Sequence, residues 1–175
     1  MPDFDVVPAG IDETLERGPL ADSVARLALR KARAVADGLA AGLVLAADTI
    51  VVIDGEALSK PMDAAEARAM LRRLRGRTHE VMTGVAVVDA ASRRQASDTA
   101  VSRVSMRDCS DGEIADYVAG GEPLDKAGAY AIQGQGGGLV AGLEGSRSNV
   151  VGLPLGVTAA LLRRFGVAVS APPEP

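Results

Sequence analysis

Residues 43–53 read LVLAADTIVVI, and this stretch decides the fold. It is rich in apolar and β-branched residues and is followed by Asp54-Gly55, a pair typical of tight hairpin turns. The pattern predicts a buried strand that is interrupted at Asp48. A carboxylate buried there without a partner destabilises the fold by several kcal/mol or becomes protonated and loses its charge. We therefore expect a cation or a hydrogen-bond donor beside it. On spacing alone, an aspartate that caps a turn explains the pattern equally well.

The segment before this strand is expected to contain a short strand, an acidic turn and a helix. Phe4–Val7 has the composition of a strand, and Pro8–Pro19 is rich in turn-forming residues. The apolar residues that follow recur at helical spacing between Asp22, which is placed to cap the helix, and Gly38, which is placed to end it.

The segment after this strand alternates between helical and strand patterns. We expect a helix that the capping box Asp63–Glu66 opens and Gly76 ends, a hairpin of strands 81–88 and 96–106, a helix from Ser110 to Gly120, strands 129–132 and 139–143, and a helix over 154–165. Alternation interrupted by hairpins favours an α/β fold with a mixed β-sheet over a purely parallel sheet. One domain over residues 1–170 is expected, followed by a disordered tail, residues 171–175.

The composition is that of an ordinary soluble globular protein. Of 175 residues, 47% are hydrophobic and 24% are charged, and no apolar run is long enough to span a membrane. A formal net charge of -4 argues against a protein that grips a polynucleotide, because that function needs a basic patch. The single cysteine agrees with a reducing cytoplasm. With no Trp, two Tyr and two Phe, recognition of a nucleobase has to depend mainly on hydrogen bonds and apolar contacts.

Several familiar motifs are incomplete. Gly134–Gly138 lacks the spacing of a dinucleotide-binding fingerprint, so we interpret it as a turn between two strands, and no Walker A sequence is present. His79 is the only histidine, which excludes Ser-His-Asp and multi-histidine metal sites and favours a structural role for His79. Cys109 is interpreted as inert, because no histidine partner is at hand.

The remaining candidates for chemistry are carboxylates and lysines. Besides Asp48, they include Lys31 on the first expected helix and Lys60 in a loop. Taken singly, each lysine is better explained as part of a solvated surface. The other basic residues of the first helix are Arg26, Arg30 and Arg33.

Short motifs that follow one another over nearly the whole chain favour a functional role for these residues over a surface role. The central motif is Ala47-Asp48-Thr49-Ile50-Val51. The others are Leu27-Ala28 with Lys31-Ala32, Lys60-Pro61, Gly76-Arg77-Thr78-His79-Glu80-Val81 with Thr83-Gly84, Lys126-Ala127-Gly128-Ala129-Tyr130, Ile132-Gln133-Gly134, and Asn149-Val150-Val151-Gly152-Leu153-Pro154. In this order they resemble the Maf-like family of nucleoside triphosphate pyrophosphatases, the septum formation proteins Maf. The resemblance implies an elongated, mixed β-sheet flanked by helices with a central substrate cleft, as in inosine-triphosphatase-like folds.

The resemblance also implies an activity: hydrolysis of nucleoside triphosphates to the monophosphate and pyrophosphate with a divalent metal, Mg²⁺ or Mn²⁺. By position, Asp48 is the catalytic acid that activates water or holds the metal, and Glu13 is a second metal-binding carboxylate. Lys31 and Lys60 are implied to contact the triphosphate. These roles agree with phosphoryl chemistry, which needs charge neutralisation and an oriented nucleophile.

Two residues point to the branch of the family that acts on dTTP and UTP. Thr49 and Gln133 match that branch, whereas the branch that acts on methylated guanosine triphosphate carries Gln and Glu at these places. A Gln amide can pair with both the donor and the acceptor of a uracil or thymine edge.

Members of the family carry a Ser-x-Ser-Pro-Arg-Arg-like segment that contacts phosphates, and Met1 comes after its place. Because such arginines stabilise phosphate charge, we expect this short form to hydrolyse triphosphates poorly. The alternative to a housecleaning enzyme is a nucleotide-binding regulatory protein linked to septum formation. Either function implies a nucleotide partner, no polynucleotide and no membrane, and leaves a homodimer open.

Overall fold

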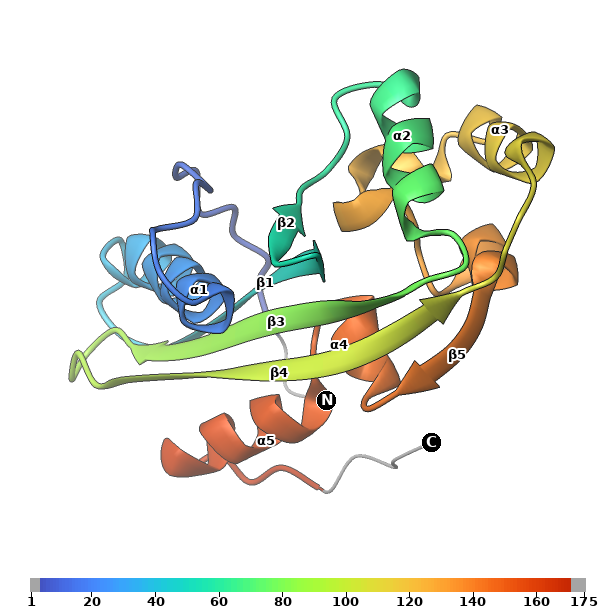
Figure 1. Ribbon diagram of the computed structural model, residues 1–175. Coiled ribbons are helices and arrows are strands. Elements are labelled where there is room, and N and C mark those ends of the chain that lie inside the picture. Colours follow the sequence, from blue (N-terminus) through green and yellow to red (C-terminus); the bar gives the residue numbers. More distant parts are fainter. Residues whose placement is uncertain (1–3, 171–175) are drawn as a thin grey trace. The chain divides into compact units, whose positions relative to one another are not determined.

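The computed structural model describes residues 4–170 and contains a five-stranded sheet with helices around it (Figure 1). The strands are β1 (Leu43–Ile53), β2 (Glu56–Leu58), β3 (Thr78–Asp89), β4 (Gln95–Met106) and β5 (Val140–Glu144). The helices are α1 (Leu20–Ala36), α2 (Ala64–Leu74), α3 (Asp111–Ala119), α4 (Arg147–Val151) and α5 (Leu155–Arg164), with 3₁₀ helices at Glu122–Asp125, Ala127–Ala129 and Gly134–Leu139. The expected α/β class is confirmed, and the expected tail lies outside the described residues.

The strands follow the order β2-β1-β3-β4-β5, and the sheet is antiparallel. Short turns join β1 to β2 and β3 to β4, whereas segments that contain helices connect the other neighbouring pairs, β1 with β3 and β4 with β5. Asp54 and Gly55, with φ angles of 56° and 77°, turn β1 into β2, which pairs with Val51–Ile53. The predicted interruption at Asp48 is wrong: β1 is continuous there, since a charged side chain does not take part in backbone pairing.

The described chain divides into two compact units. The first comprises residues 4–48, 84–99 and 156–170, and the second comprises residues 49–83 and 100–155. Residues of β1, β3 and β4 fall in both units, so each unit has its own part of the sheet and its own hydrophobic core.

The first unit is a three-layer arrangement of helix, sheet and helix. Successive residues of β3 point to opposite faces of the sheet. Ala86 and Val88 pack against one face of α1, and Val85 and Val87 pack against Leu161 of α5. Figure 1 shows α1 and α5 on opposite sides of β3 accordingly. The α1 residues in this contact are Ala28, Ala32 and Ala36, and all three are fully buried.

Helix α1 approaches β3 so closely because Gly84 has no side chain. A Cβ atom built on Gly84 would lie 2.5 Å from the carbonyl carbon and oxygen of Val24 and 2.6 Å from the nitrogen of Ala25. These neighbours are backbone atoms and cannot rotate away. The position of α1, which carries Lys31, therefore depends on glycine at this position.

We predict that Gly84→Ala lowers the free energy of unfolding by about 3 kcal/mol or more, because helix and strand must separate to admit the methyl group. Urea denaturation measures this change. Gly142→Ala in β5 is the matched control, because nothing lies within 4 Å of its Cβ position. A loss at Gly84 as small as the loss at Gly142 would show that α1 does not depend on this contact.

The second unit has a core beneath α2 and α3. Leu71 and Leu74 of α2 and Ile114 of α3 are fully buried and belong to a cluster with Val81 and Val104 of the sheet.

Both of these helices begin as the sequence predicts. The Asp63 side chain accepts a hydrogen bond from the Glu66 nitrogen at 2.8 Å, and Ser110 and Glu113 form a complete capping box. Glu66 itself accepts from the nitrogen of Met62 at 2.7 Å, so only half of the expected box at α2 is present. The hairpin of β3 and β4 is also confirmed.

Three predictions of local structure are wrong. Residues 4–7 form no strand in the described chain, since composition alone does not supply a strand with a pairing partner. Helix α1 begins at Leu20 rather than after Asp22, and Asp22 lies in its first turn, where a negative charge suits the helix dipole. In addition to these wrong predictions, no element was predicted at the position of α4.

The third error concerns the expected strand 129–132 and the glycine turn after it. The Ala131 nitrogen donates to the Tyr117 hydroxyl at 3.2 Å instead of to a neighbouring strand. The glycines then form a 3₁₀ helix that folds back on this segment: a Cβ on Gly136 would lie 2.3 Å from the Ala131 oxygen. Only glycine permits so close a return, which explains the glycine-rich composition.

Candidate active site

Lys31 and Asp48 form the centre of the candidate site. Lys31 lies on α1 and Asp48 on β1, and the Lys31 Nζ is 2.5 Å from the Asp48 Oδ1. Their side chains are only 15% and 14% exposed, so the pair is largely removed from solvent. The sequence predicts a cation or a hydrogen-bond donor beside Asp48, and the structure places the Lys31 ammonium there.

Glu13 joins this pair from the irregular segment before α1. Its Oε1 lies 2.8 Å from the Lys31 Nζ, although the Glu13 side chain is 58% exposed. One ammonium thus holds two carboxylates that are far apart in the sequence. An ammonium has three N–H donors, so these two contacts leave one for a third acceptor.

The two carboxylates keep Lys31 charged. Burial by itself lowers the pKa of Lys31, but hydrogen bonds and charge attraction from Asp48 and Glu13 outweigh it and raise the pKa above its ordinary value. The stabilisation that this charge contributes is therefore complete at neutral pH. It is lost only as the pH rises through the raised pKa.

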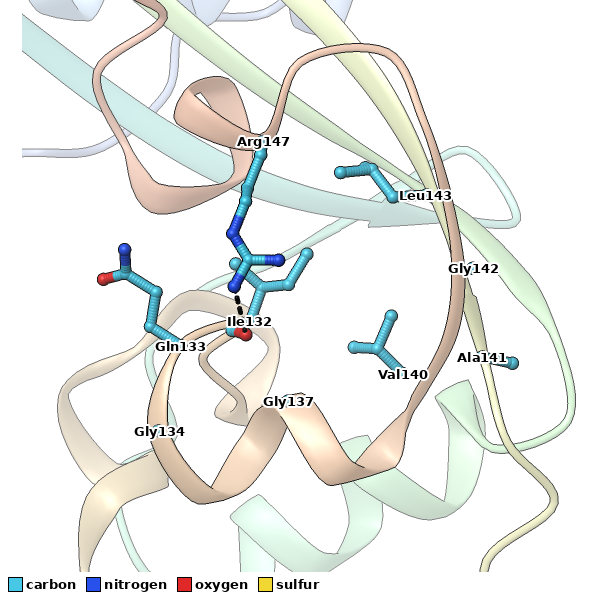
Figure 2. Close-up of a pocket in the computed structure, with 9 residues that line it drawn as sticks. All are labelled: Ile132, Gln133, Gly134, Gly137, Val140, Ala141, Gly142, Leu143 and Arg147. Carbon is cyan, nitrogen blue, oxygen red and sulfur yellow. Dashed lines mark hydrogen bonds between the residues drawn. The ribbon is translucent and has the colours of Figure 1, made fainter. Parts of the chain in front are cut away.

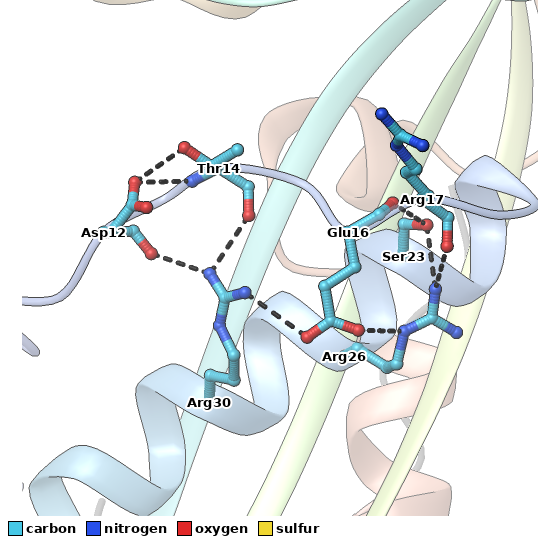
Figure 3. Close-up of polar contacts among 7 residues, drawn as sticks. All are labelled: Asp12, Thr14, Glu16, Arg17, Ser23, Arg26 and Arg30. Carbon is cyan, nitrogen blue, oxygen red and sulfur yellow. Dashed lines mark hydrogen bonds and ion pairs between the residues drawn. The ribbon is translucent and has the colours of Figure 1, made fainter.

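Arginines of α1 fix the segment that carries Glu13 (Figure 3). The Arg30 Nη2 donates to the carbonyl oxygen of Asp12 at 2.7 Å and to that of Thr14 at 3.1 Å. These carbonyls belong to the residues on either side of Glu13, so Arg30 fixes the backbone from which Glu13 extends.

A second set of contacts fixes the next turn of this segment. Arg26 forms an ion pair with Glu16, with Nε and Oε2 2.8 Å apart, and the Ser23 hydroxyl donates to the Glu16 carbonyl at 2.9 Å (Figure 3). The sequence favoured a solvated surface for Arg26 and Arg30. Both arginines instead hold the segment that carries Glu13, and their helical spacing carried no signal of this role.

Glu13 and Asp48 fit a hard divalent cation. No group of three or more His, Cys, Asp or Glu side chains suitable for a metal occurs among residues 4–170. Mg²⁺, however, is often held by one or two carboxylates together with water and substrate phosphates. Glu13 and Asp48 both contact the Lys31 ammonium, so two carboxylates from separate segments converge on one point. The donor set therefore suits Mg²⁺ or Mn²⁺ accompanied by a phosphate ligand.

The other predicted site residues, Thr49, Lys60 and Gln133, belong to the second unit. The Thr49 hydroxyl is 2.9 Å from the hydroxyl of Thr83. Lys60 is exposed in the loop between β2 and α2, and the carbonyl of its neighbour Ser59 accepts a hydrogen bond from the Gly128 nitrogen at 3.2 Å. This contact fixes the loop to the 3₁₀ region of the same unit.

Gln133 lines a pocket of about 390 Å³ (Figure 2). Gln133 and Arg147 lie on the side of the pocket opposite Val140–Leu143. The Arg147 Nη2 donates to the carbonyl oxygen of Ile132 at 3.4 Å. An amide and a guanidinium are thus available at one rim, which is suitable for a ligand that presents carbonyl oxygens.

His79 is structural, as its isolation in the sequence indicated. It is 2% exposed, and its Nε2 lies 2.7 Å from the hydroxyl of Tyr130, whose ring it meets edge to face. Burial lowers the pKa of His79 from 6.5 to about 4. The folded protein therefore keeps this imidazole neutral at a pH where an unfolded chain protonates it.

This difference predicts a pH-dependent stability. Between pH 6.5 and 4 the unfolded chain binds a proton that the folded chain does not, so the free energy of unfolding falls by roughly 2–3 kcal/mol as the pH decreases. His79→Gln should remove this part of the decrease, as urea denaturation at about pH 7 and about pH 4.5 would measure. Tyr130→Phe is the control, because it removes the hydrogen bond and leaves the imidazole buried. If His79→Gln retained the full pH dependence, other groups would be responsible.

Comparison with known proteins identifies relatives over nearly the whole length. The sequence matches the family described as "Maf-like protein" over residues 1–165. It is 56% identical to the dTTP/UTP pyrophosphatase of Myxococcus xanthus, an alignment that covers 94% of this chain and 83% of that protein. It is 53% identical to the protein of the same name from Moorella thermoacetica, over 95% of this chain and 86% of the relative. None of the helices in residues 4–170 is both long and apolar enough to cross a membrane.

Proposed function

This chain belongs to the Maf-like protein family, and we propose that it hydrolyses dTTP and UTP to the monophosphate and pyrophosphate. Relatives that are 46% to 56% identical to it carry the name dTTP/UTP pyrophosphatase. The observation that supports the proposal most is the convergence of Asp48 and Glu13 on the Lys31 ammonium. Three charged side chains from separate segments meet here, and two of them, Lys31 and Asp48, are largely buried, unlike the partners of an ordinary surface ion pair.

The reaction breaks the anhydride bond between the α- and β-phosphates. A water oxygen forms the new bond to the α-phosphorus, the electrons of the broken bond leave with pyrophosphate, and the water loses a proton. Asp48 is the acceptor for that proton, because a carboxylate at a partly buried position is a suitable general base. Lys31 orients Asp48 through the 2.5 Å contact and offers its remaining N–H to a phosphate oxygen.

Glu13 and Asp48 would hold the divalent metal, Mg²⁺ or Mn²⁺. When bound, such an ion neutralises phosphate charge and lowers the pKa of a coordinated water. Lys60, exposed on its loop, provides a further positive charge for the triphosphate. The single cysteine, Cys109, is buried and unpaired, which supports a reducing, cytoplasmic location as part of the same proposal.

The preference for uracil and thymine is assigned to Thr49 and Gln133. Uracil and thymine present carbonyl oxygens and one N–H on their pairing edge. A Gln amide supplies both a donor and an acceptor for such an edge, and a Thr hydroxyl supplies a third polar contact.

We predict that Asp48→Asn decreases pyrophosphate release from dTTP by about a thousand-fold, because the amide keeps the shape of the side chain and cannot accept the proton. The control is Asp54→Asn, at the end of the same strand, where the carboxylate is half exposed and pairs with Arg77. A thermal melt of each variant shows whether the fold is retained.

Activity of Asp48→Asn within about ten-fold of the wild type would exclude Asp48 as the central group. If the wild-type chain bound nucleotides but released no pyrophosphate, the regulatory alternative would replace the proposed enzyme.

A second prediction concerns the base. Gln133→Glu should decrease kcat/KM for dTTP and UTP about ten-fold more than for ATP and GTP, because a carboxylate cannot donate to the base carbonyl and repels it. Gln135→Glu adds the same charge at an exposed position two residues further on and serves as the control. Equal losses for all four bases would show that Gln133 does not distinguish them.

A further inference from the structure

A chain of buried polar side chains leads from Thr49 into the core of the second unit. The Thr49 hydroxyl contacts the Thr83 hydroxyl at 2.9 Å, and Thr83 donates to the backbone carbonyl of Asn149 at 3.0 Å. Thr83 and Asn149 are fully buried. The contact between Thr83 and Asn149 is therefore shielded from water, whereas Thr49 is partly buried.

Asn149 is the fixed end of this chain. Its side-chain Nδ2 donates to the Val81 carbonyl at 3.0 Å and to the Ser102 hydroxyl at 2.9 Å. Its backbone carbonyl also accepts from the Gly152 nitrogen at 3.0 Å at the end of α4. The carbonyl that Thr83 meets is thus held by the helix and by two strands.

The chemistry of the Asn149 carbonyl sets the direction of each hydroxyl. A carbonyl oxygen only accepts hydrogen bonds, so Thr83 must give it the one proton that its hydroxyl has. The Thr83 oxygen can then only accept from Thr49, and the Thr49 proton is directed at Thr83. If Thr83 donated to Thr49 instead, a lone pair of the Thr83 oxygen would face the buried carbonyl oxygen of Asn149. Two such acceptors in contact are unfavourable in a low-dielectric interior.

We propose that Thr83 is a positioning residue that makes Thr49 an obligate hydrogen-bond acceptor toward the nucleobase. The inference rests on the proposed function, in which Thr49 contacts the base. An acceptor at this place favours uracil and thymine, which carry an N–H at position 3 of the ring. It disfavours cytosine, whose unprotonated nitrogen at this position is itself an acceptor. Thr83 and Asn149 therefore take part in the choice of base without touching it.

Substitution of Thr83 tests this role through specificity. Thr83→Val keeps the shape of the side chain and frees the Thr49 proton, so the ratio of kcat/KM for UTP over CTP should fall about ten-fold. Thr83→Ser keeps the hydroxyl and should keep the ratio. In a Thr49→Val background the Thr83→Val change should have no further effect on the ratio, because the acceptor is already gone. If the role of Thr83 were purely structural, Thr83→Val would lower kcat/KM equally for UTP and CTP and leave their ratio unchanged. That result would overturn the proposal.

Two further measurements separate this proposal from the proposed function. The affinities of the wild type and both Thr83 variants for UMP and CMP report base preference even if no triphosphate is hydrolysed, and Thr83→Val should reduce the preference for UMP. Neutron diffraction from crystals of the deuterium-exchanged wild-type protein locates the hydroxyl deuterons without any substitution in the chain. A Thr49 deuteron directed at Thr83 supports the relay, whereas a Thr83 deuteron directed at Thr49 overturns it.

Discussion

A carboxylate in the middle of a half-buried strand is stable only if a cation is brought to it, and the first unit is organised around this requirement. Asp48 lies in the interior of β1, and Lys31 reaches it from α1 at 2.5 Å. An ammonium and a carboxylate both lose hydration when they approach inside a protein, so good geometry is needed for a net gain. Helix α1 must therefore lie at a fixed distance from the sheet. The absence of a side chain at Gly84, in the neighbouring strand β3, permits this close approach. The alanines of α1 have the same consequence, because small side chains let backbone layers approach one another.

The sequence predicted the parts of the fold that depend on local chemistry. The capping residues Asp63 and Ser110, the β3–β4 hairpin and the structural role of His79 all follow from nearest neighbours or from simple inventory. The need of Asp48 for a partner followed from the free energy of burying a charge. That the partner is Lys31 could not be predicted, since no periodicity connects residues 31 and 48.

Features that depend on long-range backbone contacts could not be predicted. Glu13 lies on a segment without periodic structure, and its position is set by Arg30 binding carbonyl groups, an interaction that has no sequence pattern. The 3₁₀ helix at Gly134–Leu139 forms because glycines let the chain return against residues 131 and 132. The same glycines, considered alone, are typical of a simple turn. In both cases the deciding interaction involves backbone carbonyl groups of another segment, and their partners cannot be read from the order of side chains.

The shortage of aromatic residues gives hydrogen bonds an unusual weight in this protein. Tyr117 and Tyr130 are buried and use their hydroxyls within the second unit, and the Phe165 ring lies beneath the guanidinium of Arg94 at 5.2 Å. These rings serve the structure, so stacking from them is not available to a base. Selective recognition by a hydroxyl requires that it act only as a donor or only as an acceptor, because a freely rotating hydroxyl accommodates either kind of partner. Direction therefore has to come from a group that cannot change its role, and the backbone carbonyl of Asn149 is such a group.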